Sequence, residues 1–181
     1  MELIFVRHGE TREGKKGIIL GSLDGNLTTK GKQEAKEIAY KINGKRILPD
    51  IIASSPLKRA VDTAYIISKI LGTPIVIDPL IRERVAGVAE GKTESQIDWD
   101  TYEQKPPAHR KHAGGESFLD VYKRAQKFIQ KIKRQPDKQV ILVVSHSVFI
   151  LMCIAVLRKI SIEYVLKHKP KKQMITIKIK K

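Results

Sequence analysis

Cysteine is almost absent from this chain, and its scarcity limits the classes of protein that it can represent. Among 181 residues there is one cysteine, Cys153, which lies in an apolar segment. A single cysteine cannot form an internal disulfide, so the sequence excludes a disulfide-rich scaffold and predicts a reducing, cytoplasmic location. Cysteines of this kind are more often small buried side chains than reactive thiols, and we expect burial here.

Long apolar runs are also missing. The longest one, Val148 to Leu157, is too short to span a bilayer. No basic region followed by a long apolar core occurs at the N-terminus, so no signal peptide is predicted. Hydrophobic residues still make up 41% of the chain, which indicates a globular protein with no membrane partner. We interpret residues 1–181 as one domain, because no linker or repeat divides them.

Acidic residues are scarce relative to basic ones. The chain has 19 Asp and Glu residues against 35 Lys and Arg residues, which gives a net charge of +16. This excess predicts attraction to anions, whether phosphorylated metabolites, nucleic acid or an acidic surface. The charge alone does not choose among these three.

Aromatic residues amount to only 6% of the chain. The basic C-terminal tail, Lys167 to Lys172 with Lys178, Lys180 and Lys181, has the charge to grip nucleic-acid phosphates. No aromatic side chains are interleaved with these lysines as stacking platforms. Nucleic-acid binding is therefore kept as a distant alternative, and a small anionic molecule is the expected partner.

Apolar runs alternate along the chain with segments of helical spacing. Strands are predicted at 3–6, 50–53, 74–77, 140–144 and 175–179, and helices at 30–44, 55–71, 117–132, 148–157 and 161–167. Ser55, followed by Pro56, is predicted to cap the second of these helices. The β-α-β order predicts a three-layer α/β/α sandwich with a mostly parallel sheet. The last segment alternates isoleucine with lysine or threonine, which suits an antiparallel edge strand or a homodimer contact.

The segment from 85 to 116 does not fit this alternation. It has weak periodicity, adjacent prolines and a Gly-Gly pair, and we expect an irregular excursion with one short helix at 94–102. Long loops in compact domains are often lids or binding loops. Its basic residues are equally compatible with a lid that recruits an anionic substrate and with a solvated loop. His109 and His112 lack a carboxylate or cysteine partner, so no metal site is predicted.

Chemically active side chains follow four of the predicted strands. Ligands of open α/β sheets bind outside the carboxyl ends of the strands, so these side chains are expected to meet at one edge. The residues are Arg7 and His8 after the first strand, Arg59 after the second, Glu83 after the third, and His146 with Ser147 after the fourth. Each of them alone is more often a structural or surface group. Their recurrence at equivalent positions favours a site.

The residue types suit phosphoryl transfer. Arginine forks match phosphate oxygens and stay charged, so two arginines with helix N-termini can neutralise a phosphate without a metal. One histidine can attack phosphorus and carry the phosphoryl group, while a second donates a hydrogen bond to it. A carboxylic acid can protonate the departing oxygen and then deprotonate the incoming water. No cofactor is predicted.

Six segments, in order along the chain, resemble the histidine phosphatase superfamily in its phosphoglycerate-mutase-like branch. In sequence order they are RHGET at 7–11, LGSLDGNLTTKGKQEA, SSPLKRAVDTA, LIRERVAGVAEGKT, GGESFLDVYKRA and VSHS at 144–147. The resemblance implies that His8 is the phosphorylated nucleophile and that Glu83 is the proton donor and acceptor. It implies a phosphate pocket of Arg7, Arg59 and His146, with Thr11 and the Ser147 backbone as further substrate contacts.

Three positions depart from the pattern of this family. Gly14 stands where an asparagine is frequent, Ser147 where glycine is common, and Ala89 where an aromatic residue is usual. None of these changes removes a group that the chemistry needs, but each bears on the identity of the substrate. Mutases of the family resemble longer chains with an inserted helical cover. We therefore favour a metal-independent phosphatase for a small phosphomonoester, with a cofactor-dependent phosphoglycerate mutase as the alternative.

Overall fold

The central element of the molecule is a five-stranded sheet with strand order β3-β2-β4-β1-β5. The computed structural model describes residues 1–45, 48–136, 138–170 and 173–179. Its strands are β1 (Glu2–Arg7), β2 (Ile51–Ser54), β3 (Ile75–Ile77), β4 (Val140–Ser145) and β5 (Met174–Lys178). Four of them are parallel, and β5 pairs antiparallel with β1 at the sheet edge. The predicted three-layer α/β fold with an antiparallel edge strand is confirmed.

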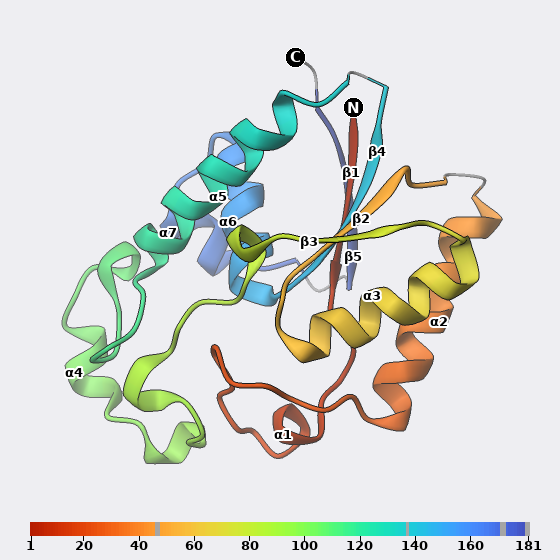
Figure 1. The fold of residues 1–181 in the computed structure, drawn as a ribbon. Coiled ribbons are helices and arrows are strands. Elements are labelled where there is room, and N and C mark those ends of the chain that lie inside the picture. Colours follow the sequence, from red (N-terminus) through yellow and green to blue (C-terminus); the bar gives the residue numbers. More distant parts are fainter. Residues whose placement is uncertain (46–47, 137, 171–172, 180–181) are drawn as a thin grey trace.

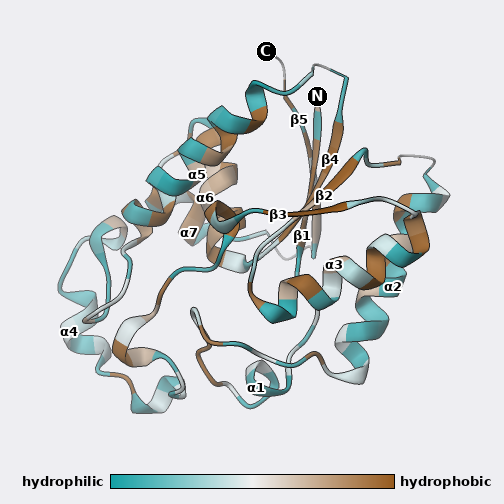
Figure 2. Ribbon diagram, viewed as in Figure 1, coloured by the Kyte–Doolittle hydropathy of each residue, from teal (hydrophilic) through white to brown (hydrophobic). Residues whose placement is uncertain are grey.

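Helices cover both faces of this sheet (Figure 1). On one face lie α2 (Thr29–Gly44) and α3 (Lys58–Leu71). On the other lie α5 (Phe118–Lys133), α6 (Ser147–Arg158) and α7 (Ile162–Lys167). Their amphipathic patterns explain this arrangement, because the apolar side of each helix faces the apolar strands and its polar side faces outward (Figure 2). The helix α6 is buried along most of its length, as expected from its continuous apolar sequence.

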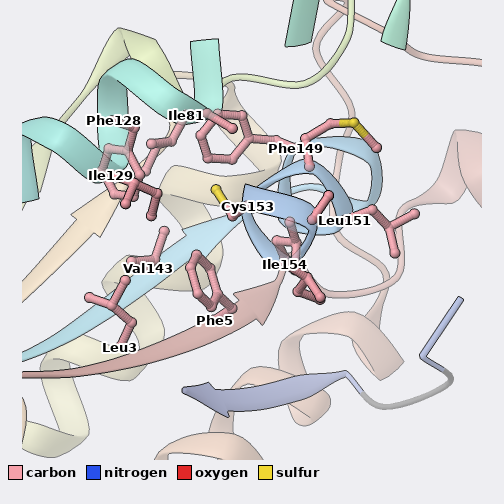
Figure 3. Packing of buried hydrophobic residues seen from close by; sticks show 14 of the residues in the cluster. Leu3, Phe5, Ile81, Phe128, Ile129, Val143, Phe149, Leu151, Cys153 and Ile154 are labelled. Carbon is pink, nitrogen blue, oxygen red and sulfur yellow. The ribbon is translucent and has the colours of Figure 1, made fainter. Parts of the chain in front are cut away.

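The core is divided by the sheet into two clusters of apolar side chains. In the larger cluster, Phe5 of β1 lies with Phe128 of α5 and Phe149 of α6, and the two phenylalanine rings of the helices meet edge to face at 5.8 Å (Figure 3). Cys153 is fully buried in the same cluster, and burial raises the pKa of its thiol well above the usual value. Its expected role as a small buried side chain agrees with this position.

The start of α3 differs from the prediction. The N-cap residue is Leu57, not Ser55, and the helix begins at Lys58. Ser55 instead continues the sheet, because its backbone N–H donates to the carbonyl of Val144. Its hydroxyl accepts a hydrogen bond from the backbone N–H of Leu57 and contacts His146. The proline after Ser55 suggested a helix cap, but in the folded protein the Ser55 hydroxyl hydrogen-bonds with His146.

The excursion after β3 carries more structure than one helix. It contains the short helix α4 (Trp99–Glu103) and 3-10 turns at Gly87–Ala89, Glu94–Gln96 and Pro107–His109. Of the lysine-rich tail, Lys171, Lys172, Lys180 and Lys181 lie outside the described residues. Among the residues that the structure describes, we find no helix with the length and apolar character that crossing a bilayer requires.

Two glycines let the loop after β1 touch the first turn of α2. A Cβ on Gly31 would lie 2.2 Å from the carbonyl oxygen of Glu10, and one on Gly9 would lie 2.3 Å from the carbonyl oxygen of Gly31. Both contacts involve backbone atoms, which cannot turn aside as a flexible side chain would. The close approach therefore requires glycine on both sides, and it holds the segment after β1 against the helix.

We predict that Gly31→Ala lowers the free energy of unfolding by about 2 kcal/mol or more, because its methyl group meets this backbone. Gly44→Ala is the matched control in the same helix, where a Cβ meets nothing within 4 Å. It should be neutral or stabilising by about 0.5 kcal/mol, since alanine favours helix over glycine. Urea unfolding of both variants measures the difference, and equal stabilities would contradict the close approach.

Candidate active site

His8 lies directly after β1, at the carboxyl edge of the sheet. Its Nδ1 is 2.8 Å from the carbonyl oxygen of Gly9, and its Nε2 is 3.3 Å from Nε of Arg59. A carbonyl only accepts and a guanidinium only donates, so Nδ1 carries the hydrogen and Nε2 presents its lone pair. The two contacts therefore select the neutral tautomer in which Nε2 is free to act as a nucleophile.

The surroundings of His8 also oppose its protonation. Burial, followed by the positive charge of Arg59, lowers its pKa from 6.5 to about 3. The Gly9 carbonyl acts in the opposite direction, and the charge of Arg7 adds a smaller lowering. Burial is the larger cause, because an imidazolium loses its hydration in this enclosure. His8 is therefore uncharged at neutral pH, with a lone pair on Nε2.

Arg59 reaches the site from the first turn of α3 and is only 2% exposed. Besides its contact with His8, it donates from Nη1 to the carbonyl of Leu23 at 2.6 Å and from Nη2 to the carbonyl of Gly21 at 2.7 Å. One side chain thus joins the segment that carries His8, α3 and the loop before α2. Hydrogen bonds hold its positive charge in place, and among the described residues no carboxylate forms an ion pair with it.

His146 follows β4 and is fully buried. Its ring centroid is 5.1 Å from that of His8, so the two predicted histidines lie side by side. Its Nε2 is 2.7 Å from Oγ of Ser55, and its Nδ1 has no partner among the described residues. Burial, followed by the charges of nearby groups, lowers the pKa of His146 well below its ordinary value. A neutral imidazole whose second nitrogen has no partner can donate a hydrogen bond from that nitrogen to a bound oxyanion.

Arg7 completes the positive side of the site. It is exposed and lines a cavity of about 210 Å³ together with His8, Arg59 and Glu83. The remaining walls are mostly apolar, with Ile18, Ile19, Leu20 and Val148 among them. The structure thus brings Arg7, His8, Arg59 and Glu83, which were expected after three different strands, to one cavity at the carboxyl edge of the sheet. His146 lies against His8 behind it.

Glu83 faces this cavity from the segment after β3. Its Oε1 accepts from the backbone N–H of Arg84 at 2.9 Å, and its Oε2 accepts from that of Val148 at 3.4 Å. Although arginines flank Glu83 in the sequence, neither forms an ion pair with its carboxylate in the described part of the chain. The carboxyl group is therefore available for proton transfer instead of being neutralised by a neighbour.

An ionic network fixes the backbone around Glu83. Arg82 and Arg124 both pair with the carboxylate of Glu116, at 2.7 and 3.0 Å respectively. Arg124 also donates to the carbonyls of Leu80, Arg82 and Glu83. The start of α5 is thereby joined to the segment that carries the candidate acid.

Thr11 and Ser147 occupy less direct positions. Thr11 is 3% exposed, and its hydroxyl accepts from the N–H of Gly14 as the N-cap of α1 (Arg12–Lys15). It borders the 210 Å³ cavity and also a second, larger cavity. Ser147 lines only the larger one. The hydroxyl of Thr11 has a structural partner, so contact with substrate through either residue stays a prediction.

The excursion lies at the lower left in Figure 1, to one side of the carboxyl ends of the strands, and its basic residues do not line the candidate site. None of the described residues Lys105, His109, Arg110, Lys111 and His112 lines either cavity. His112 instead stacks on Tyr102 at 4.4 Å, and Tyr102 accepts a hydrogen bond from Arg84 at 3.1 Å. Among the described residues no cluster of three or more His, Cys, Asp or Glu residues could hold a metal ion.

Sequence reasoning missed the groups that support the site from behind. Ser55 contacts His146 although it was expected to cap a helix. Glu90 accepts from the N–H of Ala86 and from both the N–H and the hydroxyl of Ser22, which joins the acid segment to the loop held by Arg59. The Glu-Gly pair in LIRERVAGVAEGKT was the sequence signal for Glu90, but its partner Ser22 lies 68 residues away in the chain.

Comparison with known proteins agrees with this geometry. The model of the histidine phosphatase superfamily (branch 1) matches residues 3–178. The chain belongs to this superfamily. A phosphoserine phosphatase 1 from Hydrogenobacter thermophilus is 31% identical over 155 residues, which cover 82% of this chain and 72% of the relative. A probable phosphoglycerate mutase GpmB from Escherichia fergusonii is also 31% identical, over 82% of this chain and 70% of that protein.

A solved structure has the same fold as this histidine phosphatase. It is a phosphoserine phosphatase mutant from Entamoeba histolytica in complex with phosphoserine, and the TM-score is 0.82 at 29% identity. The match covers 97% of this chain and 89% of that one. Together with the superfamily match, these relatives identify the chain as a phosphatase of the hydrolase class.

The lowered pKa of His8 makes the stability of this histidine phosphatase depend on pH. Below pH 6.5 the unfolded chain binds a proton that the folded chain does not accept until about pH 3, so stability falls as the pH falls through this window. Between pH 7 and pH 5, His8 should account for up to about 2 kcal/mol of the loss. Denaturant unfolding at both pH values measures the loss.

In His8→Gln that loss should be smaller by a similar amount. The exposed His109 supplies the control, because His109→Gln should keep the pH dependence of the unmodified protein. An unchanged dependence in His8→Gln would show that His8 is not the group that resists protonation.

Proposed function

We propose that this chain is a metal-independent phosphatase that hydrolyses a small phosphomonoester through a phosphohistidine at Nε2 of His8. The observation that carries the proposal is the tautomer of His8, which is neutral with its Nε2 lone pair beside two arginines. A metal-free nucleophile of this kind needs fixed positive charge around it to offset the phosphoryl oxygens. Arg7 and Arg59 have that charge, and phosphate oxygens would replace His8 as the acceptor for Nε of Arg59.

In the first step, the bond between Nε2 and phosphorus forms while the bond from phosphorus to the ester oxygen breaks. Glu83, in its protonated form, transfers its proton to the departing oxygen, and the product is an alcohol. In the second step, a water molecule attacks phosphorus through its oxygen, and Glu83 takes a proton from this water. The nitrogen–phosphorus bond breaks, inorganic phosphate leaves, and both His8 and Glu83 return to their starting forms.

Phosphoserine is a reasonable first substrate to test, because two relatives named above carry that activity in their names. The mutase alternative is supported by the GpmB relative. A mutase must return the phosphoryl group to an acid that stays bound, whereas a phosphatase admits water. We expect little conversion of 3-phosphoglycerate to 2-phosphoglycerate with the bisphosphate cofactor present, and rapid conversion would favour the mutase.

The proposal predicts that His8→Ala lowers kcat by roughly 10⁴-fold or more, because the covalent route is lost. Rapid acid-free denaturation after mixing with phosphorus-labelled substrate should trap label on His8 in the unmodified protein and none in the variant. Activity should persist in excess chelator. Full activity of His8→Ala, or loss of activity with chelator, would contradict the mechanism.

The role of Glu83 is tested with Glu83→Gln, which keeps the shape of the side chain but cannot transfer a proton. Its kcat should fall by roughly 10²- to 10⁴-fold for alkyl phosphates, whose leaving oxygen needs protonation. For para-nitrophenyl phosphate the loss in the first step should be much smaller, because nitrophenolate leaves without a proton. Burst kinetics separate the two steps, and equal losses of the first step for both esters would exclude Glu83 as the acid.

A further inference from the structure

A second cavity of about 580 Å³ adjoins the small cavity that contains His8. The two share Arg7, His8, Thr11 and Gly14 in their walls. The smaller one, at about 210 Å³, has room for a phosphoryl group and a few more heavy atoms. The larger volume lies within the range of sites that hold small organic ligands, roughly 300–1,000 Å³. The proposed chemistry does not use the larger space.

Gly14 is the residue at the junction that has no side chain. A Cβ there would meet one atom within 4 Å, Oγ1 of Thr11 at 2.8 Å, and otherwise open space. A larger residue at this position would place its side chain at the border between the two cavities. With glycine, a substrate that has its phosphoryl group beside His8 can extend from one cavity into the other.

The wall of the larger cavity combines an apolar surface with positive charge. Phe5, Ile150, Leu151 and Ile175 supply the apolar part. Lys15 lines it as well, and among the described residues its ammonium group forms no hydrogen bond and no ion pair within 4 Å. Lys169 also lines this cavity.

The two carboxylates of this cavity both have hydrogen-bond partners within the protein. Glu10 accepts from the hydroxyl of Thr28 and pairs with Lys30 at 3.2 Å. Glu34 accepts from the N–H of Glu10 and from the side-chain amide of Gln173. Hydrogen bonds from neutral donors leave Glu34 its negative charge, whereas Glu10 is paired with Lys30. Arg7, Lys15 and Lys169 outnumber that one carboxylate in the wall, so the wall has a net positive charge, with Lys15 on the α1 side.

We propose that the larger cavity binds the distal part of the leaving group, and that this part is an apolar body ending in an anionic group that contacts Lys15. This inference rests on the proposed phosphatase function, since it takes the phosphoryl group to be at His8. It names the substrate class as an elongated phosphomonoester with a second, remote negative charge. Gly14 allows the elongated shape, and Lys15 recognises the remote charge.

The test uses two esters of equal length, para-pentylphenyl phosphate and its analogue in which a carboxylate replaces the terminal methyl group. The unmodified enzyme should prefer the carboxylate ester by about fivefold in kcat/KM, the size of one exposed ion pair. In Lys15→Ala this preference should disappear through KM, and Lys15→Arg should restore it. Lys16→Ala is the matched control, because Lys16 is adjacent and exposed but lines neither cavity.

Equal use of both esters by the unmodified enzyme, or a preference that survives Lys15→Ala, would overturn the inference. An equal loss in Lys15→Ala and Lys16→Ala would do the same, because it would reflect general positive charge rather than a site. In these cases hydrolysis that depends on His8 would leave the proposed function standing. If neither ester, nor phosphoserine, were hydrolysed at all, the proposed function would fail and the inference with it.

Discussion

The buried guanidinium of Arg59 is the interaction on which the rest of the site depends. It lies between the nucleophile segment and the loop before α2, with one nitrogen at His8 and two at the carbonyls of Leu23 and Gly21. Burying a charge is costly unless it is well hydrogen-bonded, and these carbonyls supply the bonds without cancelling the charge. The site therefore keeps a positive charge for an incoming anion at a fixed position.

A second constraint is the neutrality of the two histidines. Burial and nearby positive charges lower the pKa of both rings, so at neutral pH neither adds a positive charge next to the arginines. The cost of this arrangement appears as the weaker stability at low pH that follows from linkage. It is offset by the two apolar clusters, where Phe5 and Val6 of the same strand are fully buried on opposite faces of the sheet. A strand that stabilises the core so strongly can carry His8 at its end.

Support for Glu83, the proposed acid, comes from a different part of the chain. Glu83 is positioned by backbone donors from its own segment and from α6, while Glu116, at the start of α5, holds Arg82 and Arg124 around it. The excursion between them packs on Arg84 through Tyr102. This contact anchors the excursion beside Glu83. A lid that recruits an anionic substrate and a solvated loop both stay interpretations of its basic residues.

The order of strands and helices was predictable from the sequence, because apolar periodicity and the residues at strand ends act locally. The superfamily and the side chains at the carboxyl edge were predictable for the same reason. The partners of those side chains were not, since they come from distant segments: Ser55 to His146, Glu90 to Ser22, Arg59 to Leu23. The sequence by itself determined which chemical groups this protein has. Only the tertiary structure decided which nitrogen of His8 is free, which charges stay unpaired and how much space surrounds them, because these depend on contacts between segments far apart in the chain.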